Sequence, residues 1–527
     1  MQNKQKFLWQ GFLMTGVSLL LRFVGVSTQI IIAGKIGAEG VGISALISGV
    51  GAFAVTLALS GIQPGCIRLM AEHLGRKDIA GARKTLTCSI LHALLFGSLS
   101  GLLLFFGADA IVRLWIRDSR ALTSLRILAI TLPFISLSSC LGGYFVAVRR
   151  VYKSACAQIV GEVLRVTFTL LLLERMVGQG LPAALVALAL GNAISDVFCA
   201  GILSLLCLID RRIHLTERSP LRGHLFDFSI IKKLLSITLP IALTTYARSG
   251  LVTLEHSLIP RGLQQFGMDH SSALAAYGVI QSMALPVLLF PCALLWSFAG
   301  LLVPEVTESH VQKDTTRIRF MMQRVFSLTL FFAIGTSGIM IAFSDILGSV
   351  LYQNSEVSHI IRLLSPLIPV MYLDSATDAM LKGLGQQVYC MKVNIIDSLL
   401  SVILVLILIP RMGIYGYILT IYITELMNAA LSIVRLLDIG NLKPPIISWV
   451  AKPLLCIIGA TCVGRLLYTA FSGRWATSER VGNLTILLFV VIFLYALLLF
   501  FTGAIKKPDL VWLGSFFKKE KNSHVPQ

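Results

Sequence analysis

Residues 18–28 read SLLLRFVGVST, and this stretch decides the class of fold. It lies in the apolar run 7–34, and about 20 apolar residues are enough to cross a bilayer as a helix. Arg22 stands near the middle of the run, about 22 Å from Phe7 at 1.5 Å per residue, too deep to extend easily to either surface. A guanidinium at mid-bilayer costs at least about 2.5–3.5 kcal/mol. Arg22 must therefore face a partner, a water-filled cavity or a substrate.

The composition extends this interpretation to the whole chain. Of the 527 residues, 56% are hydrophobic and only 13% are charged, whereas a soluble globular protein carries about 25% charged residues. The apolar runs are long and unbroken, which indicates helices, because barrel strands would show alternation. The sequence predicts an all-α integral membrane protein with about fourteen transmembrane helices.

The predicted spans fall into two sets of six and a final pair, and the longest loop separates the two sets. Because six is even, spans one and seven enter the membrane in the same direction, so a duplication would be a parallel repeat about an axis along the membrane normal. The predicted domains are a first lobe, a cytoplasmic inter-lobe loop, a second lobe, two further spans and a basic tail: 1–209, 210–232, 233–438, 439–504 and 505–527. The spans themselves are 7–34, 42–68, 85–108, 122–148, 155–176, 183–209, 233–260, 271–303, 321–344, 357–384, 388–409, 413–437, 449–471 and 482–504.

The net charge of +19 is distributed as in a multi-pass membrane protein. Lys and Arg concentrate in every second loop, which is the positive-inside signature, so the charge does not indicate a nucleic-acid partner. We expect a bacterial plasma membrane protein with both termini cytoplasmic. The first run is too long for the apolar region of a signal peptide, and no small-residue cleavage site closes it, so we interpret it as a retained span.

The chain carries no sequence motif for catalysis or for a bound cofactor. It has no P-loop and no H-E-x-x-H, and its ten cysteines stand singly, without a C-x-x-C pair. We therefore expect neither an enzyme nor a resident cofactor, and the only candidate for coupling is Na⁺ or H⁺.

A weak internal repeat relates two arginines inside spans. Arg22 lies 16 residues after the lysine that opens its run and 13 before the basic residue that closes it; the corresponding spacings of Arg248 are 15 and 13. We expect the two arginines to face each other across a central cleft that attracts anions. The alternative is an inter-helix salt bridge that only fixes packing.

Three further charged residues are candidates for the lining of this cleft. Glu162 and Arg165 are three apart and lie on one helix face, so they either neutralise each other or line the cleft. Glu255 lies two turns from Arg248 on the same face. Together with His256 it is a candidate for proton or cation coupling, the alternative being a wetted position near the outer mouth.

A second acidic group is a candidate cation site. Asp374 and Asp378 are four apart, and the eleventh span adds Asn394 and Asp397. Two like charges in low dielectric raise one pKa or recruit a cation, and hard cations prefer such oxygens. The alternative is that Asp378 simply pairs with Lys382.

Four stretches of the chain resemble one superfamily of exporters. They are LLLRFVGVST and its continuation (19–46), LPIALTTYARSGLVTLEHSLIPRGL (239–263), AAYGVIQSMALPVLLFPCALLW and its continuation (275–309), and DAMLKGLGQQVYCMKVNIIDSLL and its continuation (378–419). In their order and spacing they resemble the polysaccharide-transporter branch of the multidrug/oligosaccharidyl-lipid/polysaccharide (MOP) exporter superfamily, in particular its stage V sporulation protein B-like and lipid II flippase-like members.

The resemblance implies two six-helix lobes related by a pseudo-two-fold axis around a central cavity, with two extra C-terminal helices. It implies a flippase that moves an undecaprenyl diphosphate-linked sugar or peptidoglycan precursor from the inner to the outer leaflet by alternating access. Arg22 matches a cavity arginine of the lipid II flippases, whereas Thr28 and Gln281 stand where those proteins have further arginines. The implied partners are the anionic lipid-linked sugar and membrane lipid.

Two other functions stay open. One is a cation-coupled multidrug or metabolite antiporter of the same fold, for which the span-ten aspartates would be the cation site. The other is a non-transporting membrane scaffold, with the loop 210–232 and the basic tail docking cell-wall or spore-coat synthases or anionic lipid heads. Plain positive-inside anchoring also accounts for both segments.

Overall fold

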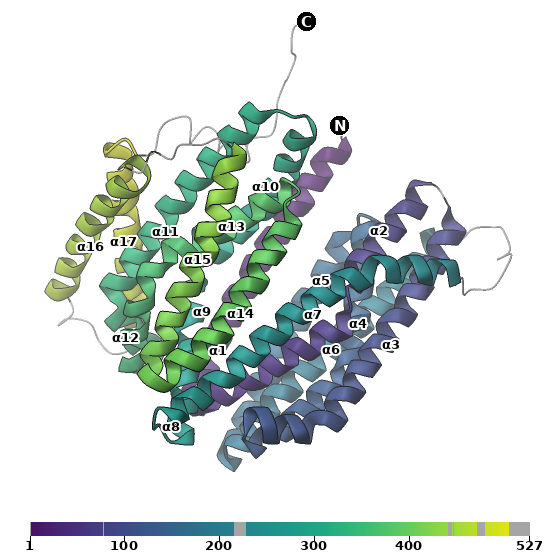
Figure 1. Cartoon of the computed structure of the whole chain (residues 1–527), viewed down its shortest axis with the longest axis horizontal. Helices are drawn as coiled ribbons and strands as arrows, with labels where there is room; N and C mark the ends of the chain where they lie inside the picture. The colour runs from purple at the N-terminus through teal and green to yellow at the C-terminus, as the bar shows by residue number, and fades with distance from the viewer. Residues whose placement is uncertain are drawn as a thin grey trace, which may run out of the picture. The chain divides into compact units, whose positions relative to one another are not determined.

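The computed structural model describes residues 2–76, 78–214, 228–440, 445, 447–471 and 480–504. Most of the predicted inter-lobe loop, residues 215–227, and the predicted tail 505–527 lie outside the described residues. Every regular element within the described ranges is helical (Figure 1), so the predicted all-α class is confirmed.

Helices make up almost all of the described residues. In chain order they are α1 (Gln2–Leu59), α2 (Ile62–Gly75), α3 (Ile79–Ile111), η1 (Val112–Ile116), η2 (Ser119–Ala121), α4 (Leu122–Ala147), α5 (Val151–Met176), η3 (Val177–Gln179), α6 (Leu181–His214), α7 (Phe228–Gln265), α8 (His270–Gly278), η4 (Val279–Ala284), α9 (Leu285–Leu289), α10 (Cys292–Val311), α11 (Thr315–Leu351), α12 (Ser355–Leu364), η5 (Ser365–Leu367), α13 (Ile368–Gly383), α14 (Gln387–Met412), α15 (Ile414–Gly440), η6 (Ile447–Ala451), α16 (Lys452–Phe471) and α17 (Arg480–Phe501).

The first of these, α1, consists of two arms joined at Gly37. A straight helix of its 58 residues would be about 87 Å long, almost three times the bilayer core of about 30 Å. Gly37 has φ 71° and ψ 178°, which is open mainly to glycine, and it changes the direction of the chain (Figure 1). Thirteen described stretches are long and apolar enough to cross a membrane, and one of them, Leu19–Gly75, holds both arms. Counted as two crossings, it brings the number to the predicted fourteen.

The chain divides into two compact units. The first comprises Met1–Pro286 and Asn394–Ile421, and the second comprises Val287–Val393 and Tyr422–Gln527. The first unit therefore contains the predicted first lobe together with α7, α8 and parts of α14 and α15. The division into lobes at 210–232 stays a prediction.

The core of the first unit is built on close helix contacts. Leu86 of α3, Tyr144 of α4 and Met70 of α2 are completely or almost completely buried in it. A Cβ on Gly97 would lie 2.2 Å from the Ser136 Oγ, so only glycine allows α3 and α4 to approach this closely. Small residues at such crossings are typical of helix packing in membranes.

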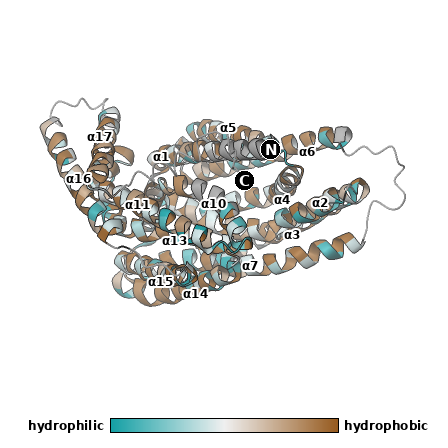
Figure 2. Ribbon diagram, turned by 90° about the horizontal axis from the view of Figure 1, so that it is seen from above, coloured by the Kyte–Doolittle hydropathy of each residue, from teal (hydrophilic) through white to brown (hydrophobic). Residues whose placement is uncertain are grey.

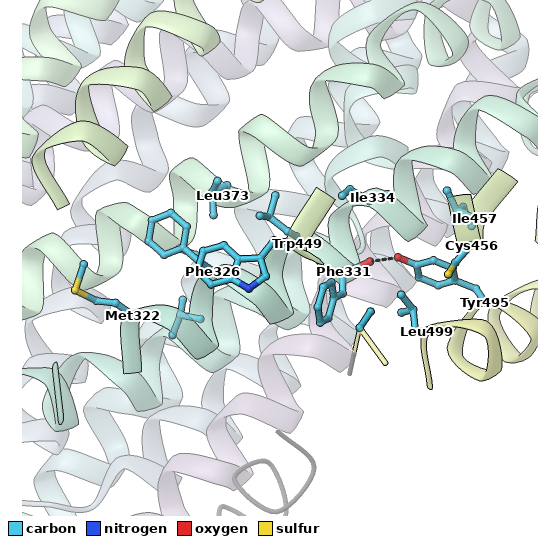
Figure 3. Close-up of a cluster of buried hydrophobic side chains, with 14 of the residues drawn as sticks. Met322, Phe326, Phe331, Ile334, Leu373, Trp449, Cys456, Ile457, Tyr495 and Leu499 are labelled. Carbon is cyan, nitrogen blue, oxygen red and sulfur yellow. Dashed lines mark hydrogen bonds between the residues drawn. The ribbon is translucent and has the colours of Figure 1, made fainter. Parts of the chain in front are cut away.

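The core of the second unit joins the last two helices to α11 (Figure 3). Trp449 stacks on Phe326 with ring centroids 6.1 Å apart. The Tyr495 hydroxyl of α17 donates to the Phe331 carbonyl of α11 at 2.8 Å, which satisfies a buried polar group. The two C-terminal helices are thus an integral part of the second unit.

Large apolar side chains remain exposed on the helix faces. Phe106 of α3 is 77% exposed and Phe493 of α17 is 68% exposed, and hydrophobic residues run along helices such as α5 and α16 (Figure 2). Exposed apolar surface on this scale marks contact with something other than water. Together with the lengths of the helices, it indicates faces that border lipid.

Candidate functional site

The first group of charged side chains lies on α4, α5 and α6 of the first unit. Glu162 and Arg165 form the predicted ion pair, with Arg165 Nε 2.9 Å from Glu162 Oε2 and a second bond through Nη2. Asp196 of α6 lies close to Thr131 of α4 and within electrostatic range of Arg165. Arg165 is therefore paired with Glu162 and lies in the field of a second carboxylate. We call Glu162, Arg165 and Asp196 the first-lobe charge cluster.

This cluster packs against the first arm of α1. A Cβ on Gly25 would lie 3.8 Å from Arg165 Nη2 and 3.9 Å from Glu162 Oε1. Arg22 precedes Gly25 by three residues, so it lies about one turn away on the same side of α1, and it is half-buried. The structure thus brings the predicted residues Arg22, Glu162 and Arg165 to one region of the first unit.

Thr28 is placed differently from this predicted set. It is only 4% exposed, and its hydroxyl donates to the Val24 carbonyl at 2.7 Å. In this conformation Thr28 is engaged by its own helix and offers no free polar surface.

The second group lies on α7 and the part of α14 that belongs to the first unit. Glu255 lies beside Ser401 and within electrostatic range of Asp397. Asp397 in turn interacts with Arg248, and one of its carboxylate oxygens is buried without a hydrogen-bond partner among the described residues. We call Arg248, Glu255, Asp397 and Ser401 the α7 acid cluster. Within it, Arg248 lies in electrostatic range of Asp397, and Ser401 lies beside Glu255.

Aromatic hydroxyls surround this acid cluster. The Tyr277 hydroxyl lies 2.9 Å from His256 Nδ1, and the Tyr417 hydroxyl donates to Gln281 Oε1 at 3.4 Å. Both tyrosines are almost completely buried, and both lie within electrostatic range of Glu255. Gln281 belongs to η4, a π-helical segment, and such segments are frequent at functional sites.

Arg248 is exposed on α7 although it belongs to an apolar span. Its helix packs along the second arm of α1, where Thr253 donates to the Gly49 carbonyl at 3.1 Å and Tyr246 to the Leu57 carbonyl at 3.2 Å. Arg22 lies on the other arm. That the two arginines face each other across a cleft stays a prediction.

The four residues predicted to bind a cation are divided between the two units. Asp374 and Asp378 belong to the second unit, whereas Asn394 and Asp397 belong to the first. Asp378 pairs with Lys382 at 3.2 Å, the alternative that the spacing allowed. Within the described ranges, no three or more His, Cys, Asp or Glu side chains are grouped to hold a metal ion. Asp397 instead joins Glu255.

Sequence reasoning missed three members of this site, namely Tyr277, Ser401 and Tyr417. Ser401 follows Asp397 by four residues, so it shares a helix face with a candidate that the sequence singled out. The two tyrosines carry no comparable signal, because a tyrosine in a span is ordinary core material.

Two family models match the chain. Residues 8–294 match the family described as Polysaccharide biosynthesis protein, and residues 266–407 match MatE. The chain is 24% identical over 420 residues to Stage V sporulation protein B of Bacillus subtilis (strain 168), which covers 78% of this chain and 80% of that protein. It is 20% identical over 254 residues to Sporulation protein YkvU of the same organism, which covers 48% of this chain and 56% of that protein.

Solved structures share the fold at low sequence identity. The lipid II flippase MurJ in an inward closed conformation matches with a TM-score of 0.64 and 14% identity, over 95% of this chain and all of the other. An inward-facing multidrug resistance MATE family transporter of the MOP superfamily matches with a TM-score of 0.64 and 14% identity, over 81% of this chain and 99% of the other. These likenesses show the fold.

Proposed function

We propose that this chain, which belongs to the polysaccharide biosynthesis protein family of the MOP exporter superfamily, is a flippase for a lipid-linked anionic sugar. Its substrate would be an undecaprenyl diphosphate-linked sugar or peptidoglycan precursor, moved from the inner to the outer leaflet by alternating access. The positive-inside pattern favours a bacterial plasma membrane location with both termini cytoplasmic.

The observation that carries the proposal is the pair of guanidinium groups inside apolar helices. Arg22 is half-buried in α1 and Arg248 is exposed on α7, and neither position is tolerable against lipid alone. Guanidinium groups bind phosphate oxygens through charge-assisted, bidentate hydrogen bonds. Two such groups match the diphosphate of a lipid-linked sugar, while the polyprenyl tail stays in lipid.

The α7 acid cluster is the site that we propose for coupling. Glu255 and Asp397 are two neighbouring carboxylates with one hydroxyl, from Ser401, beside them, and one Asp397 oxygen is buried and unsatisfied. A proton or a Na⁺ ion there would relieve the repulsion between the carboxylates and satisfy that oxygen. The same pair supports the alternative function of a cation-coupled multidrug or metabolite antiporter, because paired acids also attract cationic substrates.

A third candidate is a non-transporting scaffold for cell-wall or spore-coat synthesis. Its predicted docking segments, the loop 210–232 and the tail 505–527, lie mostly outside the described residues. The scaffold predicts that replacing Arg22 and Arg248 leaves function intact while changes in these segments abolish it.

The test is binding of undecaprenyl diphosphate, beside a non-phosphorylated polyprenol, measured by native mass spectrometry on the purified chain. Wild type is compared with Arg22→Ala/Arg248→Ala, and Arg113→Ala, an exposed arginine of η1, is the matched control. Diphosphate-selective binding that only the double variant loses supports the flippase. Equal, weak binding of both lipids by all three proteins refutes the proposed anion site, and cationic drugs would then be the ligands to test.

A further inference from the structure

A small cavity opens where the ends of α2, α4 and α6 meet in the first unit. It has a volume of about 240 Å³, and its wall includes Leu74, Tyr144, Val148, Arg149 and Asp210. It lies at the opposite end of α4 from the loop after α3. The positive-inside pattern assigns this end to the cytoplasmic side. It belongs to neither the first-lobe charge cluster nor the α7 acid cluster.

A buried carboxylate holds the basic residues of this cavity in place. Asp210 is 1% exposed and accepts a hydrogen bond of 2.8 Å from the Tyr144 hydroxyl. It also binds the side chains of Arg150 and Lys153. Asp210 and the two cationic side chains that it binds together carry a net charge of +1. Arg149 lies at the cavity wall and adds another.

Arg149 is the group that is left to bind a ligand. Its side chain is exposed, and no hydrogen bond or ion pair engages it within the described part of the chain. Its φ of 58° is the left-handed conformation that ends α4, where the Arg150 N–H bonds the Phe145 carbonyl at 2.8 Å. The next residue, Arg150, directly precedes α5 and gives it no side-chain cap, so the positive end of that helix adds to the field at this site.

The surroundings of the cavity favour a lipid over a soluble anion. Leu74 and Val148 give it an apolar wall. Val146, one turn before Arg149 at the end of α4, is 36% exposed, an apolar surface beside the cavity that suits acyl chains. Basic pockets between helices on the cytoplasmic side are suited to anionic head groups.

We propose that this cavity binds the phosphate of an anionic phospholipid, with Arg149 and Arg150 as its ligands and the acyl chains against the exposed apolar end of α4 at Val146. The phosphate joins the α4–α5 turn to the end of α6, next to the inter-lobe connection. A bound lipid therefore stabilises this corner of the first unit. A phospholipid head group and a free phosphate ion both present phosphate oxygens to these arginines. The experiment therefore has to distinguish the two ligands.

The experiment compares phosphatidylglycerol, phosphatidylcholine and inorganic phosphate as ligands of the purified full chain, with binding measured by native mass spectrometry and thermal stability. Arg149→Ala is the test variant, because Arg149 makes no side-chain contact on which folding depends. We expect it to weaken phosphatidylglycerol binding about tenfold. Arg149→Lys should retain part of the affinity as a point charge, and Arg113→Ala should retain all of it.

Selective binding of phosphatidylglycerol that Arg149→Ala weakens supports the proposal. Equal binding of phosphatidylglycerol by wild type and Arg149→Ala overturns the site. Stabilisation by inorganic phosphate alone, lost in Arg149→Ala, assigns the cavity to a soluble anion and overturns the lipid.

Discussion

Replacing Gly42 by alanine tests how tightly α8 is held against the second arm of α1. A Cβ on Gly42 would lie 2.0 Å from the Leu274 carbonyl oxygen, and one on Gly278 would lie 2.4 Å from the Ala38 carbonyl oxygen. Ordinary contact begins at 3.4 Å, so the two backbones have to separate by about 1.4 Å. Neither obstacle is a side chain that can rotate away. The methyl group must therefore displace a whole helix.

The expected magnitude follows from this crossing and from the ion pairs beside it. An added methyl in a tightly packed contact costs about 1–3 kcal/mol. Arg120 binds Glu39 and Asp118 at 2.6 Å each, and His270 lies 3.6 Å from Asp118, which ties α1, η2 and α8 together at the same end. These ion pairs resist the separation of α8 from α1. The added methyl group therefore raises the free energy of the conformation in which the two helices are in contact. Conformations with α8 away from α1 should become about 5- to 150-fold more populated.

Pulsed electron paramagnetic resonance measures this shift directly. Spin labels at Ser48→Cys on the second arm of α1 and Ser271→Cys on α8, both exposed positions, report the distance between the two helices once the two exposed native cysteines are replaced. Gly42→Ala should enrich the longer distances. Gly34→Ala is the matched control on α1, because its Cβ would meet nothing within 4 Å. Identical distance distributions in the two variants would refute the reasoning.

Three further predictions rest on single charged groups. Arg165→Ala leaves Glu162 without its cation and should lower the free energy of unfolding by about 1–3 kcal/mol, measured by thermal unfolding in detergent; an unchanged melting temperature would contradict the ion-pair geometry. Asp397→Asn removes a counter-charge of Arg248 and should tighten undecaprenyl diphosphate binding in native mass spectrometry, whereas weaker binding would show that Asp397 helps the anion site. Burial raises the pKa of Asp118, but hydrogen bonds from Arg120 and the nearby positive charges outweigh it and lower the pKa below its ordinary value. Its stabilisation is thus present above about pH 4 and lost as the pH falls through the lowered pKa, so the stability difference between wild type and Asp118→Asn should shrink and then disappear as the pH is lowered below about 4.

The sequence predicts what depends on one helix at a time. The lengths of the apolar runs predict the helices. A spacing of three or four residues predicts the ion pairs Glu162–Arg165 and Asp378–Lys382, because the two partners lie on adjacent turns of one helix. The partner of Asp397 is a different case, since it lies on another helix. The spacing of residues along α14 shows on which face of that helix Asp397 lies. It does not show which other helix packs against that face.

The break inside α1 is a second feature that the sequence alone does not predict. Gly37 is one of 43 glycines, and only its positive φ distinguishes it from those within straight helices. Gly42 and Gly278 are likewise ordinary in sequence, although their backbones touch. A glycine's role depends on the helix opposite, which no local pattern records.

The state of the internal carboxylates decides how strongly the proposed site holds an anion. Arg165 is already bound by Glu162 and lies in the field of Asp196, and Arg248 already interacts with Asp397. A diphosphate reaching Arg248 therefore exchanges one anionic partner for another, which keeps the net gain small and the binding reversible, as a flippase requires. A proton or Na⁺ taken up by Asp397 would remove the competitor and strengthen the diphosphate's hold on Arg248. Because such linkage is reciprocal, a bound diphosphate would strengthen the affinity of the acid cluster for the cation by the same factor.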